Sequence, residues 1–297
     1  MPLKVIFRGF WPGFTPTSAP GKFFLEIFNN IYASEGPVIP TTKISEADIL
    51  FESCFDGSAI KWRKWRATFF YSGESYAIQG WKDYDVVFWG EATTAAPNII
   101  TLPLYPLYLL DLGEPPQPSP NRLHVPPKDV LVMISNPGGS ARNSFLEELA
   151  ASDLQITYAG KYKNNIGGPF PHPFGSPEFA AFASQYKFVI TMENSQQSAY
   201  ITEKVLQGLF AENIPIYYGA PRITEYINED RILILGGESS IKGTIERMRH
   251  LAATPEEWLE TVRQPWRGPL ADTLTPTCLA EQCVAVLSRK GGIAMRK

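Results

Sequence analysis

A short stretch in the second half of the chain combines the polar residue types that a phosphate-binding site needs. These residues are Asn194, Tyr200, Glu203 and Lys204. The spacing of apolar residues after the loop 193–198 predicts a helix that ends near Glu212. Glu203 and Lys204 fall in its first turn, where free backbone N–H groups and the helix dipole favour an anion. A phosphate-bearing donor therefore suits this stretch, although a solvated helix face would also explain a Glu–Lys pair.

The elements around this stretch place its polar residues at one edge of a sheet. Apolar runs at 187–192 and 214–218 predict strands on either side of the helix. One face of the helix is apolar. The other face carries Tyr200, Glu203, Lys204 and Gln207. In open α/β sheets, ligands bind beyond the C-terminal ends of the strands, and the loop 193–198 follows such an end.

The whole chain alternates strands and helices, which is typical of parallel α/β sheets. In the first half, strands are predicted at 3–8, 47–52, 67–71 and 84–89, and a helix at 22–32. In the second half, the further predictions are a strand at 130–134 and helices at 140–151, 254–265 and 277–288. Ser140 is the expected cap of the first of these helices. The segment 113–128 contains six prolines and is the best linker candidate. We therefore expect two α/β domains, residues 1–120 and 121–297, with the terminal helix a candidate to pack back on the first domain.

The composition excludes several classes of protein. The 297 residues carry 27 basic and 30 acidic side chains, a net charge of −3, and 44% of them are hydrophobic. Proteins that bind nucleic acid usually show a basic excess, so no nucleic-acid partner is expected. The three histidines are far apart, which excludes a His-x-x-x-His zinc helix. The three cysteines fit neither a disulfide framework nor a zinc ribbon, which favours a cytoplasmic protein with reduced thiols.

Membrane association is expected to be peripheral at most. The N-terminus lacks the apolar core of a signal peptide. The longest uncharged run, between Glu91 and Asp111, contains three prolines that would break a spanning helix. The segment 61–66 alternates Trp with Lys and Arg. The edge of a helix is its simplest interpretation, and contact with a membrane surface is the second.

The polar stretch resembles the signature of the α-1,3/4-fucosyltransferase family, and it is most similar to the short bacterial members. The matching segments are Glu193-Asn194-Ser195, Tyr200-Ile201-Thr202-Glu203-Lys204 and Ile214-Pro215-Ile216. Met192 stands where the family usually has Phe, an apolar exchange that changes little.

Two further segments agree with this family in the same order along the chain. Ser135-Asn136-Pro137 followed by Arg142-Asn143 resembles a segment whose Arg contacts the donor diphosphate. In the first half, Tyr71-Ser72-Gly73-Glu74 is similar to a strand end of the family, and Pro103-Leu104-Tyr105 matches a segment farther along.

The resemblance implies a GT-B fold, in which two Rossmann-like domains with parallel sheets face each other across a cleft. It implies an inverting α-1,3-fucosyltransferase that moves L-fucose from GDP-β-L-fucose to an acceptor glycan, usually the 3-OH of N-acetylglucosamine. Glu74 matches the general base, and Glu203 matches a second carboxylate that contacts the fucose. Arg142 and Lys204 match groups on the diphosphate, and Asn194 and Tyr200 match other donor-pocket residues.

No metal or other cofactor is expected, because Arg142 and Lys204 already supply cations for the departing phosphate. Asp83-Tyr84-Asp85 has the D-x-D form that some glycosyltransferases use to hold a metal ion. It introduces an apolar strand, so a structural role at the start of that strand is favoured.

Two alternatives remain open from the sequence. The chain could be a GT-B transferase that uses another nucleotide sugar, or a non-catalytic glycan-binding protein with the same fold. Glu74, Arg142, Glu203 and Lys204 are all present, which favours an active enzyme.

Overall fold

The computed structural model divides into two compact units. It describes residues 1–297 except 57–58, 76–79, 91–95, 118–123, 237–239 and 290–297. Unit 1 contains Met1–Asp111, Ser198–Tyr200 and the segment from Asp272 onward. Unit 2 contains Leu112–Gln197 and Ile201–Ala271. The last helix, α9 (Pro276–Arg289), therefore belongs to unit 1, and the three residues Ser198–Tyr200 make their contacts there as well.

Unit 1 is built on a six-stranded sheet in which every neighbouring pair is parallel. Its strands are β1 (Leu3–Arg8), β2 (Val38–Pro40), β3 (Ile49–Ser53), β4 (Ala67–Ser72), β5 (Val86–Trp89) and β6 (Ile99–Thr101). Their order in the sheet is β2-β1-β3-β4-β5-β6. The chain thus winds first to one side of β1 and then to the other, which is the doubly wound topology.

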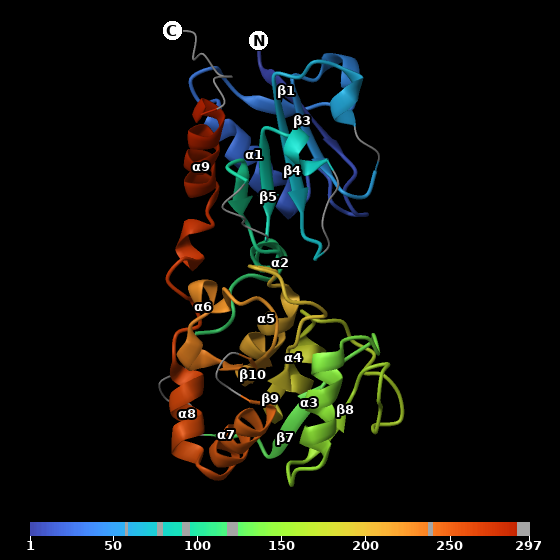
Figure 1. Ribbon diagram of the computed structural model, residues 1–297, viewed down its shortest axis with the longest axis vertical. Helices are drawn as coiled ribbons and strands as arrows, with labels where there is room; N and C mark the ends of the chain where they lie inside the picture. The colour runs from blue at the N-terminus through green and yellow to red at the C-terminus, as the bar shows by residue number, and fades with distance from the viewer. Residues whose placement is uncertain (57–58, 76–79, 91–95, 118–123, 237–239, 290–297) are drawn as a thin grey trace. The chain divides into compact units, whose positions relative to one another are not determined.

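Helices and aromatic side chains cover the sheet of unit 1. Helix α1 (Ala19–Ile31) lies beside α9, and both face the strands (Figure 1). Phe24 and Phe28 of α1 pack on rings from the central strands, with Phe24 centred 4.6 Å from Phe51. The opposite face is covered by the short 3-10 helices η2 (Ala59–Trp62) and η3 (Trp81–Asp83). Helix α2 (Tyr105–Leu112) follows the last strand.

Unit 2 holds a second parallel sheet. Its strands are β7 (Lys128–Val132), β8 (Ile156–Tyr158), β9 (Tyr186–Ile190), β10 (Ile214–Tyr217) and β11 (Leu233–Ile234), in the order β11-β10-β9-β7-β8. The direction of winding reverses between β7 and β9, so the topological switch point lies there. Val132 pairs with Ile190, which brings the C-terminal ends of these two strands to the same level.

Helices pack on both faces of this second sheet. One face carries α3 (Ser140–Ala150), α7 (Ile241–Ala253) and α8 (Pro255–Arg263), whose apolar residues form one core with Val130, Val132 and Ile190. The other face carries α4 (Pro177–Ala183), which packs on Leu131 and Val189, and α5 (Glu203–Phe210), which contacts α4, β9 and β10. Helix α6 (Ile223–Tyr226) is a single turn.

The α/β class and the main strands are confirmed, and two local predictions were wrong. The helix expected to follow Ser198 begins only at Glu203, because the Thr202 side chain caps the helix by accepting from the Lys204 backbone N–H. Ser140 was expected to cap α3, but the cap residue is Gly139, whose φ of 103° suits glycine. Short elements such as β6 and β8 were not predicted.

No helix within the described ranges is both long enough and apolar enough to cross a bilayer. Part of the proline-rich segment, 118–123, lies outside the described residues.

Candidate functional site

A cavity of about 290 Å³ opens at the switch point of unit 2. Its walls come from the segments that follow β7 and β9 and from the first turns of α3 and α5. The lining residues are Met133, Ile134, Ser135, Asn136, Arg142, Ile190, Met192, Asn194, Glu203, Lys204 and Gln207. The topology explains this location. Ligands of open α/β sheets bind at the C-terminal ends of two neighbouring strands whose following connections lead to opposite sides of the sheet.

Arg142 forms one wall of this cavity and is only 3% exposed. Its Nη1 donates to Asn194 Oδ1 at 3.0 Å, and its Nη2 donates to the backbone oxygens of Asn136, at 2.6 Å, and Gly138. Burial lowers the pKa of the guanidinium from its usual value. Within the described residues, no carboxylate forms an ion pair with it, so neutral carbonyl groups hold its charge in place.

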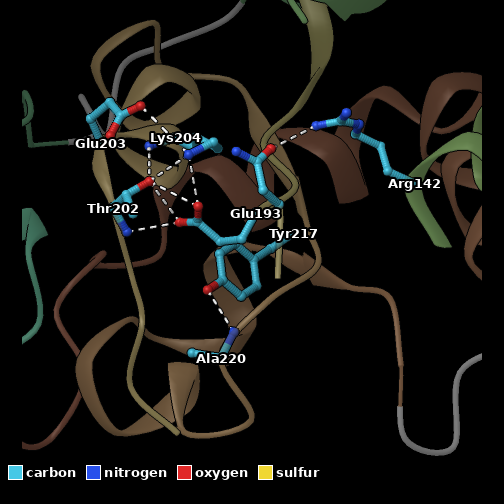
Figure 2. A network of polar contacts seen from close by, with 8 residues as sticks. Arg142, Glu193, Thr202, Glu203, Lys204, Tyr217 and Ala220 are labelled. Atoms are coloured by element: carbon cyan, nitrogen blue, oxygen red, sulfur yellow. Dashed lines mark hydrogen bonds and ion pairs between the residues drawn. The ribbon is translucent and has the colours of Figure 1, made fainter. Parts of the chain in front are cut away.

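Lys204 supplies the second cation, in the first turn of α5. Its Nζ lies 2.8 Å from Glu193 Oε2, 2.9 Å from Thr202 Oγ1 and 3.6 Å from Glu203 Oε1. Figure 2 shows the Glu193 carboxylate below Lys204 and beside Thr202, and Arg142 on the other side of the view. The Lys204 side chain is 21% exposed, so it is neither solvated nor buried.

Glu193 lies directly behind this cation, and its side chain is fully buried. Burial raises the pKa of its carboxyl group, and the nearby ammonium of Lys204 opposes that shift. Glu203 lines the cavity itself, with 26% of its side chain exposed. The cavity therefore has two cations on its walls and one partly exposed carboxylate, an arrangement that can bind a diphosphate and contact a polar group attached to it.

The structure brings four predicted residues together in unit 2, and two others belong to unit 1. Arg142, Asn194, Glu203 and Lys204 all line the same cavity. Tyr200 was expected on the polar face of the helix, which is wrong, because it precedes the first helical residue and makes its contacts in unit 1. Its contact with a donor stays a prediction.

Glu74 follows β4 in unit 1 and is half-buried. Its backbone is held at both ends. Its N–H donates to Ser72 Oγ at 3.1 Å, and its carbonyl oxygen accepts from Trp89 Nε1 at 3.1 Å. No hydrogen bond joins its carboxylate to another described residue. A fixed backbone whose carboxylate is not engaged by any described residue suits a general base.

The D-x-D segment has a structural role. Asp85 Oδ2 accepts from the backbone N–H and hydroxyl of Thr68, at 2.8 and 2.9 Å, which fixes the start of β5 against β4. Asp83 ends the 3-10 helix η3. In the part of the chain that the structure describes, no three His, Cys, Asp or Glu side chains are grouped to hold a metal ion.

Sequence reasoning gave no role to Glu193 or Thr202, although both lie inside the recognised motif. Their contact joins residues nine positions apart through a loop without regular structure. Periodicity cannot predict such a contact. The available signal was chemical, since an acidic residue directly after an apolar strand needs a partner if it is buried.

Comparison with known proteins identifies the domain that holds this cavity. Residues 125–263 match the family model described as Glycosyltransferase family 10 (fucosyltransferase) C-term. The matched segment makes up most of unit 2, which is therefore similar to the C-terminal domain of the family-10 fucosyltransferases. Its four cavity residues Arg142, Asn194, Glu203 and Lys204 all fall within the matched range.

Two relatives of known description share part of their sequence with this chain. A putative fucosyltransferase-like protein of Arabidopsis thaliana is 27% identical over 191 residues, which cover 63% of this chain and 34% of that protein. An alpha-(1,3)-fucosyltransferase of Helicobacter pylori is 28% identical over 128 residues, 43% of this chain and 25% of that one. The matches thus span about a third or less of these relatives.

The fold comparison covers almost the whole chain. A crystal structure of an alpha1,3-fucosyltransferase with GDP matches with a TM-score of 0.71 at 19% identity, over 97% of this chain and 90% of that one. At this identity the likeness shows the fold, which is the GT-B arrangement of two parallel-sheet α/β domains.

Proposed function

We propose that the chain transfers L-fucose from GDP-β-L-fucose to a hydroxyl group of an acceptor glycan, with inversion at the anomeric carbon. One observation carries this proposal. Arg142 and Lys204, from the first turns of two different helices, line one cavity at the switch point of unit 2, most of which matches the family-10 model. Such a pair of cations suits the diphosphate of a nucleotide sugar.

The proposed reaction is a single displacement. The acceptor oxygen attacks the anomeric carbon while the Glu74 carboxylate takes its proton, since a neutral hydroxyl is a poor nucleophile. The bond between the anomeric carbon and the β-phosphate oxygen breaks, and GDP leaves with the electron pair. Negative charge therefore grows on the β-phosphate, and Arg142 and Lys204 would stabilise it there.

The remaining cavity residues suit contacts with the rest of the donor. Glu203 Oε1 is 3.6 Å from Lys204 Nζ, so its carboxylate would lie beside the diphosphate, where the sugar is attached. It can accept hydrogen bonds from fucose hydroxyls and support the positive charge that develops on the ring. Asn194 and Tyr200 are proposed as further donor contacts.

The acceptor we propose is a glycan whose N-acetylglucosamine presents its 3-OH, which makes the activity an α-1,3-fucosyltransferase. The choice between an α-1,3 and an α-1,4 linkage follows from how the acceptor presents its hydroxyl groups to Glu74.

A panel of donors tests the function directly. The chain should transfer from GDP-fucose to a Galβ1-4GlcNAc acceptor and should show little transfer from GDP-mannose, UDP-glucose or UDP-galactose. NMR of the product should show an α-fucosyl linkage. Preference for another donor would favour a different nucleotide-sugar transferase. If the chain shows no transfer, no donor hydrolysis and no GDP binding, a glycan-binding protein would be favoured.

Activity should persist in excess EDTA, because fixed cations already face the diphosphate and no metal-binding role is evident for Asp83 or Asp85. Initial rates with GDP-fucose would be measured with and without the chelator, and again after Mn²⁺ or Mg²⁺ is added. Complete loss that either metal restores would contradict the proposed way of stabilising the leaving group.

We also propose a cytoplasmic protein that touches a membrane surface through unit 1. Phe55 and Trp62 are 50% and 58% exposed, and Lys61 and Lys64, close to Trp62 in the sequence, are exposed as well. Exposed aromatic rings next to cations suit the interface of an anionic bilayer.

The wild-type chain should co-sediment with vesicles that contain 30% anionic lipid. The double variant Trp62→Ser, Lys61→Gln should bind these vesicles several-fold more weakly. Equal sedimentation of both chains would contradict the assignment.

A further inference from the structure

Glu193 has an environment that the roles assigned so far do not explain. Its side chain is fully buried directly behind the cavity wall. Its backbone N–H donates to the Tyr218 carbonyl oxygen at 2.6 Å, which fixes it to the end of β10. A Cβ on Gly219 would lie 2.6 Å from Glu193 Cγ, so the neighbouring strand end has room only for glycine. The segment that follows β10 therefore fixes the backbone of Glu193 and packs closely against its side chain.

The carboxylate holds both the start of α5 and the cation on its first turn. Glu193 Oε1 accepts from the backbone N–H and the hydroxyl of Thr202, each at 2.8 Å. Glu193 Oε2 accepts from Lys204 Nζ, also at 2.8 Å (Figure 2). Thr202 is the cap residue of α5, and its hydroxyl also accepts from Lys204 Nζ. One buried acid thus fixes the position of the ammonium relative to the helix.

Stability alone is a poor explanation for this pair. A buried ion pair often contributes little or nothing to folding, because removing two charges from water offsets their attraction. A neutral side chain could also have accepted the hydrogen bonds of Thr202. The pair makes sense if its purpose is to place a cation, since Lys204 is the one member that reaches the cavity wall.

A competing acid gives this placement a further reason. Apart from Glu193, the carboxylate that pairs with Lys204 is that of Glu203, whose Oε1 is 3.6 Å from Lys204 Nζ. An ion pair between Glu203 and Lys204 alone would draw the ammonium along the cavity wall. It would also occupy the carboxylate that suits the sugar. Glu193 prevents this by holding Lys204 from behind.

We propose that Glu193 is a positioning residue for the donor diphosphate, and that it acts through Lys204. This inference rests on the proposed function of the cavity. It assigns the Glu193 carboxylate to the placement of the ammonium, with no contact of its own to the donor.

A mutant cycle in GDP affinity tests the inference. Glu193→Gln should weaken GDP binding by about tenfold, since a hydrogen bond to a charged group is misplaced. In a Lys204→Ala background the same substitution should cause no further loss, because the residue through which it acts is gone. Calorimetry with GDP would be applied to all four chains. The KM for GDP-fucose should rise with the Kd for GDP, while the KM for the acceptor stays unchanged.

Glu52→Gln is the matched control for a general effect of neutralising a buried acid. Glu52 is 1% exposed in β3 of unit 1, where its carboxylate accepts from the Tyr84 hydroxyl and the Ala59 backbone N–H. This variant should leave GDP affinity unchanged. If Glu193→Gln does not fold, Glu193→Asp keeps the charge but shortens the side chain by one methylene, and it should also weaken GDP binding.

The outcomes separate this inference from the proposed function. Unchanged or tighter GDP binding in Glu193→Gln, or an equal loss in the Lys204→Ala background, would overturn the positioning role. A wild-type chain that binds no GDP would instead overturn the proposed function of the cavity.

Discussion

Glu74→Gln should lower kcat for fucosyl transfer by about 10²–10⁴ and leave GDP affinity nearly unchanged. The substitution keeps the size of the side chain but removes its ability to take a proton. The backbone of Glu74 is fixed by Ser72 and Trp89, so the amide should lie where the carboxylate does. Because GDP binding is assigned to unit 2, the donor affinity should be insensitive to a change in unit 1.

Two comparisons make this result specific. Glu74→Asp keeps the base but withdraws it by one methylene, so it should retain more activity than Glu74→Gln. Glu52→Gln neutralises a different carboxylate of unit 1, and it should retain most of the wild-type turnover. Rates would be measured at saturating GDP-fucose and acceptor, and GDP binding by calorimetry. Turnover of Glu74→Gln within a few-fold of wild type would place the base elsewhere.

The sequence was sufficient to predict the class of the fold, because the periodicity of apolar residues and the turn residues between elements are local properties of the sequence. The buried strands β1, β3, β4 and β9 are apolar runs that need no knowledge of their partners. The three-residue strands β6 and β8 have too few residues to show a pattern. Strand order could not be predicted from local pattern, yet it decides where the switch point lies and therefore where β7 and β9 place their loops.

The part of the candidate site that could be predicted consists of charged residues near the start of a helix, where the residue type indicates the role. Arg142 and Lys204 both lie in first turns, and the structure places both on one cavity. Tyr200 was misplaced because helical periodicity was extended backward past a cap. Residue type alone does not decide where this helix begins, because Ser198 and Thr202 are both good cap residues. The acid that fixes Thr202, Glu193, lies nine positions before it.

Arg142 and Lys204 should each be needed for tight donor binding and for turnover. Each residue presents a cation to the same cavity, and the leaving β-phosphate gains charge as the reaction proceeds. Removing either should weaken GDP affinity by about 1.5–3 kcal/mol, or roughly 10- to 150-fold. Each change should also lower kcat, because the interaction strengthens in the transition state.

The two substitutions must be chosen so that they report on the ligand rather than on the fold. Arg142 donates to Asn136, Gly138 and Asn194, so Arg142→Ala would also release a loop. Arg142→Lys is the better variant because it keeps the charge and loses the two-pronged contact of the guanidinium group. Lys204→Ala leaves the buried Glu193 without its cation, which is strongly destabilising in other proteins. Thermal midpoints should therefore accompany each affinity, and Glu193→Gln should restore part of the stability lost in Lys204→Ala.

The combined variant then distinguishes one shared group from two separate ones. If Arg142 and Lys204 hold the same diphosphate, the loss in the double variant should deviate from the sum of the single losses. Residues on separate parts of the ligand would give additive losses within about 0.5 kcal/mol. GDP affinity by calorimetry and turnover with GDP-fucose would be measured for all four chains of the cycle. Unchanged GDP affinity in both single variants would contradict the assignment of this cavity to the diphosphate. It would also contradict the assignments of Asn194 and Glu203 as donor contacts.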